Sequence, residues 1–511
     1  MRIVRIGAWP LLLALALTAP ARSLAQDAGS TGQESTGQGS TTPATNVPSI
    51  NNEPGASAPV AIVPGTSVPG AAIPIEGLTG LTSLPAEYTN YDVSAGLGET
   101  DNVRLSNTHP ESQTLTALNG FFDFIRSGSH LDLNAVGNFS DTDYLEGAYG
   151  NQVLGRFDGI ADLTLWEHRF KWLVRDDYGN QQVDLLESLT PTNLQRVNVF
   201  STGPDLTLQP TLTTFVEMTG IYSRNSWQDE PFSGNTETGT LTAGHQLSPT
   251  STISLVGQVQ EERFDNTSLD TGNIDYQVRE YYGRYALVDA RSAVDLQAGV
   301  AQANDRGTWT SSPLLTLSLS RSVSPFSTVH LTGGRDFSNA MGSFSSLDTG
   351  ATGGIPVGAA TQTTGNAVHT YGNLSWAYQR LRTGVSLSGG WERQNYDVAS
   401  RFNFTTTDIA LSLRRQLTPR LSATVMATAD RGQYGNQGFT NTYGTVDAGL
   451  VYRPGTWVVV YGRYDHQFRR SSGLTQGFGY DENRIYVMVG YYPHTSGTGV
   501  PQGMGGGSGM Y

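Results

Sequence analysis

The sequence of 511 residues contains no cysteine and almost no lysine. The missing cysteines exclude a disulfide scaffold, thiolate catalysis and metal sites with cysteine ligands. Charged residues make up only 15% of the chain, well below the roughly 25% of an average globular protein. Of the 31 basic residues only Lys171 is a lysine, and the net charge is −14. This balance argues against a nucleic-acid partner, because nucleic-acid binders carry basic faces.

The chain also lacks an apolar run long enough for a transmembrane helix, which needs about 20 residues. Its longest apolar run, residues 8–19, follows Arg2 and Arg5 and precedes the small residues Ser23 and Ala25. This order is typical of a secretory signal peptide that is cleaved before Gln26. We therefore assign residues 1–25 to a signal peptide for Sec-type export. A membrane-anchor helix is the alternative, but the run is short for it.

Two segments of low complexity flank the central part of the chain. Residues 26–86 are rich in Ser, Thr, Gly, Pro, Gln and Ala and contain no aromatic residue. Such a segment cannot bury enough apolar surface to offset its ordering entropy, so we predict a disordered periplasmic arm. Residues 494–511 are predicted to be a Gly-rich flexible tail. Residues 87–493, between them, have a different pattern.

Apolar and polar side chains alternate along residues 87–493, which is the period of a strand with two different faces. In residues 251–260, for example, Ile253, Leu255 and Val259 share one face, and Ser254 and Gln258 share the other. Short breaks recur about every 40 residues, as in a repeat of short turn, strand, long loop and strand. The nine breaks centre near Gly128, His168, Pro210, Pro249, Ala290, Pro325, Arg380, Pro419 and Gly455.

This repeat favours a membrane barrel. Two strands per repeat do not fit a propeller blade of four strands, whereas tilted strands of about 9–11 residues match a hydrocarbon core. Longer polar stretches between the breaks, such as 265–273, 304–312 and 469–482, predict the long outer loops of such a barrel. Aromatic residues beside the short breaks predict an interfacial girdle: Trp166, Phe170, Trp172, Trp376, Tyr378, Tyr452 and Trp457.

The predicted fold class is therefore all-β, a transmembrane antiparallel up-and-down β-barrel of about 20 strands over residues 87–493. A count of 18 stays open, because residues 196–209 are interrupted by Gly203 and Pro204. A soluble β-solenoid is the alternative fold. Residues 337–367 form the longest loop, and the sequence leaves open whether this loop folds into the lumen or faces outside.

Charged side chains in the strands are predicted to line a water-filled lumen. Barrels of 16–18 strands already enclose an aqueous channel, and a charge facing lipid near the midplane costs about 2–4 kcal/mol. Both signs occur among many hydroxyl and amide side chains, which favours neutral or mildly charged polar cargo. The predicted pore-lining residues are Arg156, Asp158, Asp162, Arg175, Arg196, Glu217, Glu280, Arg284, Asp295, Arg414, Asp430, Asp447, Arg463 and Asp465.

Motifs for chemistry are absent from the sequence. The eight histidines form no i, i+2 or i, i+4 pair, and there is no nucleophile elbow, phosphate-binding loop or calcium loop. The sequence thus predicts a protein that is not an enzyme and that uses no metal and no cofactor. The enzymatic alternative is a lipase-like barrel in which His330 or His466 acts with a lumenal serine.

Three segments resemble the putative beta-barrel porin 2 family. These are the first strand and loop at residues 93–103 (VSAGLGETDNV), the recurring Leu-Ser-Pro turn, and the final strand at residues 483–491 (NRIYVMVGY). The resemblance extends over residues 88–492. It implies a barrel in the outer membrane of a Gram-negative bacterium, in contact with outer-membrane lipid. Such barrels are often associated with exopolysaccharide export, so it also implies periplasmic polysaccharide-export components as partners.

Together, these patterns lead us to expect an outer-membrane pore for polar cargo, with an exported exopolysaccharide as the first choice. A general diffusion porin for small solutes and a surface-display or adhesive barrel are the alternatives.

The signal peptide yields the first testable prediction. N-terminal sequencing of the protein isolated from outer membranes should begin at Gln26, because Ser23 and Ala25 offer small residues at the −3 and −1 positions. Replacing Ala25 with a bulky residue (Ala25→Phe) should block processing and leave a precursor that is larger on a denaturing gel. A mature protein that still begins at Met1 would contradict the assignment.

Overall fold

The computed structural model describes residues 87–167, 169–183, 190–228, 233–267, 275–305, 307–338, 357–358, 367–396, 403–434, 439–472 and 479–492. The predicted signal peptide (1–25), arm (26–86) and Gly-rich tail (494–511) lie outside these residues. Over the described ranges, no helix is long and apolar enough to cross a membrane.

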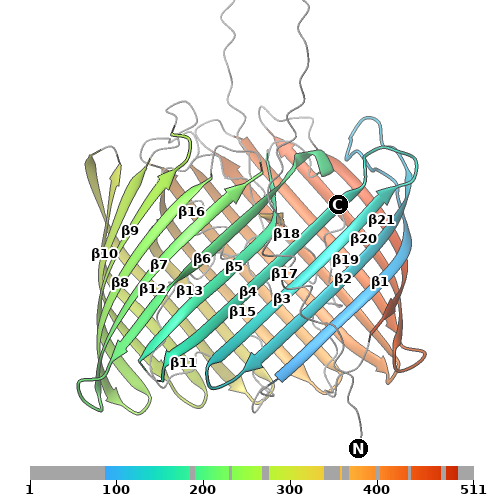
Figure 1. Ribbon diagram of the computed structural model, residues 1–511. Coiled ribbons are helices and arrows are strands. Elements are labelled where there is room, and N and C mark those ends of the chain that lie inside the picture. Colours follow the sequence, from blue (N-terminus) through green and yellow to red (C-terminus); the bar gives the residue numbers. More distant parts are fainter. Residues whose placement is uncertain are drawn as a thin grey trace, which may run out of the picture. The chain divides into compact units, whose positions relative to one another are not determined.

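Twenty antiparallel strands of 12–17 residues form one closed barrel (Figure 1). Ten run from the rim with the short turns to the rim with the longer loops: β1 (Glu87–Thr100), β3 (Leu131–Tyr144), β5 (Phe170–Gln182), β7 (Thr214–Trp227), β9 (Ser251–Phe264), β11 (Ser292–Asp305), β13 (Ser327–Ser338), β16 (Thr383–Tyr396), β18 (Leu421–Tyr434) and β20 (Val458–Ser472). Ten run back: β2 (Gln113–Ser127), β4 (Gln152–Trp166), β6 (Leu194–Leu208), β8 (Gly234–Ser248), β10 (Tyr276–Val288), β12 (Thr308–Ser324), β15 (Ala367–Arg380), β17 (Phe404–Thr418), β19 (Phe439–Tyr452) and β21 (Tyr480–Tyr491).

The ring closes because β1 pairs with β2 on one side and with β21 on the other. Closure leaves no ring strand with an unpaired edge, as hydrocarbon requires of a sheet. The predicted fold class and the count of 20 strands are confirmed. The interrupted stretch around Gly203 and Pro204 belongs to a single strand, β6, which pairs with β5 without a break from Leu194 to Leu206.

The predicted breaks coincide with the nine turns at one rim, which we call the short-turn rim. These turns contain two to five residues, and β1 begins and β21 ends at this rim (Figure 1). The opposite, long-loop rim has one connection that was mispredicted. Residues 304–312 were expected to form a long loop, but Asn304 pairs with Trp309 and the connection is only residues 306–307. Backbone pairing does not need apolar side chains, so these polar strands continue their ladder beyond the expected length of about 11 residues.

The two faces of the wall follow the predicted alternation. On β9 the outward side chains of Ile253 and Leu255 are exposed, Leu255 to 71%, whereas the inward Ser254 and Gln258 are buried. The inner face of a barrel is concave and crowded, so inward side chains cover one another, while outward ones stand apart.

The predicted aromatic girdle lies at the short-turn rim. The rings of Trp166, Trp172, Trp376 and Trp457 are exposed on this rim. Trp457 stacks on Tyr491 with 6.2 Å between the ring centroids. Amphipathic rings at this level suit a membrane–water interface.

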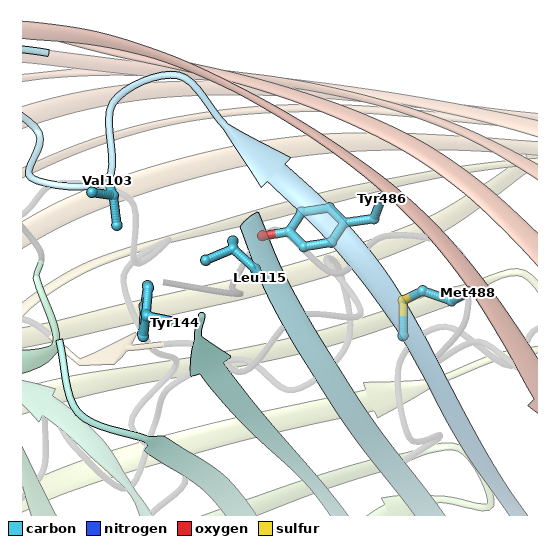
Figure 2. Packing of buried hydrophobic residues seen from close by; sticks show 5 residues of the cluster. All are labelled: Val103, Leu115, Tyr144, Tyr486 and Met488. Atoms are coloured by element: carbon cyan, nitrogen blue, oxygen red, sulfur yellow. The ribbon is translucent and has the colours of Figure 1, made fainter. Parts of the chain in front are cut away.

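The connection between β1 and β2, residues 101–112, packs against the inner wall near the long-loop rim. Its residue Val103 joins Leu115 of β2, Tyr144 of β3, and Tyr486 and Met488 of β21 in a buried cluster, whose side chains converge in Figure 2. Apolar contacts thus occur on the inner face, where the alternation rule alone predicts only polar side chains.

Two further residues of the same connection hold it in place. Leu105 has a φ of 50° and packs on Tyr443 and Tyr480. The Asn102 amide donates hydrogen bonds to the carbonyl oxygens of Ser106 and Asp481, at 2.9 and 2.8 Å. The mouth of the barrel is therefore narrowed from inside on the arc of β19 to β3.

Strand β14 (Val357–Gly358) lies outside the ring order and belongs to the predicted longest loop. It pairs in parallel with Asn180 and Gln181 of β5, although β13 and β15, its neighbours in the chain, pair with each other. β4 pairs with β5 only as far as Tyr178, so β14 takes the position that β4 leaves. Since β6 to β12 separate β5 from β13 around the ring, part of this loop lies against a distant part of the wall.

The register of the wall can be tested with a single charge. Leu241 lies in the middle of β8 and is 51% exposed on the outward face. Leu241→Arg should lower the free energy of unfolding in lipid vesicles by about 2–4 kcal/mol, because this is the cost of an arginine that faces lipid near the midplane. Thr238→Arg, on the inward face of the same strand, is the matched control and should cost clearly less. Equal losses in urea titrations would contradict the register.

Candidate functional site: the lumen wall

The strand registers place thirteen of the fourteen predicted pore-lining residues on the inner face. Several of them alternate with outward apolar side chains that are exposed, such as Leu163 beside Asp162, Tyr281 beside Glu280, and Tyr464 beside Arg463. The thirteen residues are Arg156, Asp158, Asp162, Arg175, Glu217, Glu280, Arg284, Asp295, Arg414, Asp430, Asp447, Arg463 and Asp465. Whether they contact a cargo stays a prediction.

Arg196 is the exception, and its predicted inward position is wrong. It shares the outward face of β6 with Phe200, and both side chains are exposed. The alternation rule failed here because Val197 and Val199, whose apolar side chains suggested a lipid contact, are buried on the inner face. Arg196 lies only two residues from Leu194, the end of β6 at the long-loop rim.

Arginines on the inner face bridge aspartates that oppose each other across two strands. Asp158 of β4 and Asp177 of β5 are direct cross-strand partners, an arrangement that would be destabilising for two like charges alone. Arg175 donates to Asp177 at 2.7 Å and its guanidinium lies 3.6 Å from Asp158. The nearby pair of Lys171 and Asp162 is looser, at 3.8 Å.

The same arrangement recurs on β19 and β20. Asp447 and Asp465 are direct cross-strand partners, and Arg463 forms ion pairs with both, at 2.7 Å to Asp465. In each case the arginine precedes an aspartate by two positions on its own strand. Asp177 was missed from the sequence, although this Arg-x-Asp spacing could have marked it.

Other inward charges are paired as well. Arg284 of β10 forms an ion pair with Asp295 of β11. Arg484 of β21 donates two hydrogen bonds of 2.7 Å to Glu482, which also accepts from Gln467 and Thr100. Glu482 is fully buried among these donors. Eight of the thirteen inward residues named above thus lie within 4 Å of an opposite charge: Asp158, Asp162, Arg175, Arg284, Asp295, Asp447, Arg463 and Asp465.

A buried histidine between two carboxylates was also missed by the sequence analysis. The Nδ1 atom of His369 (β15) lies 3.4 Å from Asp336 (β13), and its Nε2 atom lies 3.3 Å from Glu392 (β16). The Tyr371 ring stacks on the imidazole at 4.7 Å. These residues meet only through cross-strand register, so no local spacing could reveal them. Within the described ranges, no group of three or more His, Asp or Glu side chains is arranged to hold a metal ion.

Rows of hydroxyl groups cover other parts of the inner face. Thr236, Thr240 and Thr242 are buried on β8, where the outward Leu241 is exposed. They hydrogen-bond to neighbouring strands, as from Thr240 to Gln258 at 3.3 Å. The two longest rows are Thr236, Thr238, Thr240 and Thr242 on β8, and Thr316, Ser318, Ser320 and Ser322 on β12.

The Arg463 bridge can be tested by removing its guanidinium. Arg463→Gln leaves Asp447 and Asp465 facing each other without their shared cation, so it should lower the free energy of unfolding by about 1.5–3 kcal/mol, the range for hydrogen bonds to charged groups. Lys171→Gln is the control, because its 3.8 Å contact is partly exposed and should contribute less than about 1 kcal/mol. Denaturant titration of both variants checks the difference, and equal losses would contradict the bridge.

The likenesses of this chain to solved structures are weak. No curated protein sequence matches the chain. The siderophore receptor PirA from Acinetobacter baumannii aligns over 80% of this chain and 81% of its own, with 10% identity and a TM-score of 0.45. The FrpB iron transporter (F3-3 variant) from Neisseria meningitidis aligns over 79% and 81%, with 8% identity and a TM-score of 0.40. Likenesses this weak carry no argument about the function of this chain.

A family model gives the more specific result. The model of the putative beta-barrel porin 2 family matches residues 348–491, so the resemblance predicted from the sequence is confirmed over these residues. Residues 88–347, which include the segment at 93–103, lie outside the match. Within the closed barrel, the chain is therefore similar to this porin family over its last strands.

Proposed function

We propose that the barrel is a passive outer-membrane conduit for a hydrophilic polymer, and that its cargo is an exported exopolysaccharide. The observation that supports this most is the pairing of charges on the lumen wall, as in the Arg175 and Arg463 bridges. Paired charges cancel much of each other's field, so they neither attract nor repel an uncharged chain strongly.

The hydroxyl row on β12, whose side chains are only half-buried, supplies the attractive part of this mechanism. A hydroxyl group can donate one hydrogen bond and accept others, as can the hydroxyl groups of a sugar. Cargo moving along such a wall exchanges hydrogen bonds with Thr and Ser side chains, and no covalent step is involved. The proposed conduit is accordingly not an enzyme.

The route to the membrane and the partners belong to the same proposal. Residues 1–25 direct Sec-type export, and the arm, residues 26–86, precedes β1 in the chain, which begins at the short-turn rim. This rim faces the periplasm if the usual orientation of outer-membrane barrels holds. The arm is then on the side where periplasmic polysaccharide-export components would bind.

Two measurements separate this function from its alternatives. Single-channel recording of the refolded protein in planar bilayers should show an ion-conducting pore with weak charge selectivity. A non-conducting barrel would favour surface display or adhesion over both transport functions. Deleting the gene should remove the surface polysaccharide; an unchanged polysaccharide together with a conducting pore would favour the general diffusion porin.

The hydroxyl row on β12 yields a more specific prediction. The triple variant Ser318→Ala, Ser320→Ala and Ser322→Ala leaves each side chain nearly the same size but removes three half-buried hydroxyl groups. At about 0.5–1.5 kcal/mol for each lost hydrogen bond, neutral oligosaccharides should block the channel at least about tenfold more weakly.

The salt conductance of this variant should remain close to the wild-type value, because the lumen keeps its width and charge. Replacing the same three serines with threonine retains the hydroxyl groups and is the control. Unchanged oligosaccharide block in the alanine variant would contradict a role for this row in cargo contact.

A further inference from the structure

Eight arginines on the outward face form a belt near the long-loop rim. Each lies within three residues of the end of its strand. Register pairs confirm the face: Arg224 lies opposite Phe200 and Arg279 opposite Val259, both exposed apolar side chains. The belt consists of Arg196 (β6), Arg224 (β7), Arg263 (β9), Arg279 (β10), Arg335 (β13), Arg393 (β16), Arg431 (β18) and Arg470 (β20).

Three belt arginines have carboxylate partners at the rim. Arg224 forms an ion pair with Asp265, and this hydrogen bond lowers the pKa of the Asp265 carboxyl. Arg470 pairs with Asp481 at 2.8 Å. Arg263 pairs with two carboxylates, Glu261 at 2.9 Å and Glu237 at 3.6 Å. Their charges are therefore compensated within the protein.

The other five have no such compensation among the residues that the structure describes. No carboxylate of those residues lies within 4 Å of the guanidinium groups of Arg196, Arg279, Arg335, Arg393 and Arg431. Arg279 lies over the Trp309 ring at 4.4 Å. The neutral groups of Asn395 and Ser312 accept hydrogen bonds from Arg393 and Arg335. These five cations stand at the edge of the apolar outer surface, and none has a carboxylate partner within the described part of the chain.

The chemistry of these positions indicates which anion fits. A guanidinium presents a planar fork of donors that matches a phosphate in a two-point contact, whereas an ammonium acts as a point charge. All eight belt positions carry arginine. The contact of Arg279 with an exposed tryptophan is typical of the membrane–water interface, where an anion belongs to a lipid headgroup and its acyl chains can cover the apolar face below.

We propose that Arg196, Arg279, Arg335, Arg393 and Arg431 bind the headgroup phosphates of a phosphorylated glycolipid in the outer leaflet. The inference depends on the orientation of the barrel in the outer membrane and not on its cargo. Acyl chains and phosphate on one molecule match the apolar face and the belt above it. A free phosphate ion matches only the belt and has only salt-screened attraction to hold it.

The test measures lipid binding to the purified full-length protein in neutral detergent by native mass spectrometry. The probes are a phosphorylated diglucosamine lipid, the same lipid after enzymatic removal of its phosphates, and inorganic phosphate. The wild-type protein should bind the phosphorylated lipid at least about tenfold more tightly than the dephosphorylated one. Equal binding of the two lipids, or displacement of the lipid by equimolar inorganic phosphate, would overturn the proposal.

Matched double variants locate the binding at the belt. Arg393→Gln with Arg431→Gln removes two uncompensated belt cations and should weaken binding of the phosphorylated lipid about threefold to tenfold. Arg393→Lys with Arg431→Lys keeps both charges but loses the two-point geometry. Its affinity for the phosphorylated lipid should lie between that of the wild type and that of the glutamine double variant.

Arg321→Gln with Arg415→Gln is the control, because both residues face outward within three residues of the short-turn rim. This control should leave binding of the phosphorylated lipid unchanged. A loss of binding as large as that of the belt variant would show a general effect of charge and would contradict a binding site at the belt. Heat-modifiable gel mobility verifies that each barrel is folded.

Discussion

Backbone hydrogen bonding in hydrocarbon is the constraint on which the rest of this structure depends. A strand with an unpaired edge cannot stay in the bilayer core, because nothing there replaces water as a partner for its N–H and C=O groups. The pairing of β1 with β21 removes the last edge. Once the ring is closed, each strand has one lipid face and one lumen face, and every side chain must suit one of them.

This division explains the composition. The average hydrophobicity hides two surfaces, an apolar one outside and a polar one inside, as on β9 with Leu255 outward and Gln258 inward. Charge is scarce because the lipid band excludes it. Some of the inward charges are arranged as bridges in which one arginine serves two aspartates, as Arg463 does for Asp447 and Asp465. The outward arginines lie near the rims, within reach of water and headgroups, whereas Asp176 lies on the outward face in the middle of β5, opposite Phe200.

The long-loop rim is where the structure departs most from a plain cylinder. Residues 101–112 pack inward on apolar side chains such as Leu115 and Tyr486, and β14 pairs with β5 at a point where β4 has left the ladder. Residues 101–112 cover inward apolar side chains, and β14 pairs with β5 backbone groups; a regular barrel would leave both facing water. Both features lie at the long-loop end of the wall, where the regular pairing of successive strands is interrupted.

The sequence by itself determined the barrel, its nine short turns, its strand number and the inward position of thirteen charged residues. It could do so because alternation with a period of two is a local property, and because lipid enforces it on every strand. The error at Arg196 arose near the rim, where lipid constrains the alternation less. There Val197 and Val199 are apolar but lie buried on the inner face, so apolar character no longer indicates which side chains face lipid.

Only the tertiary structure decided which side chains meet across strands. The bridge of Arg175 to Asp158, the contacts of His369 with Asp336 and Glu392, and the placement of β14 against β5 all join residues that are distant in sequence. Cross-strand register sets these contacts, and register depends on how the whole ring closes. The same closure brings the arginines of eight separate strands to one level, where a pattern that is invisible along the chain becomes a belt around it.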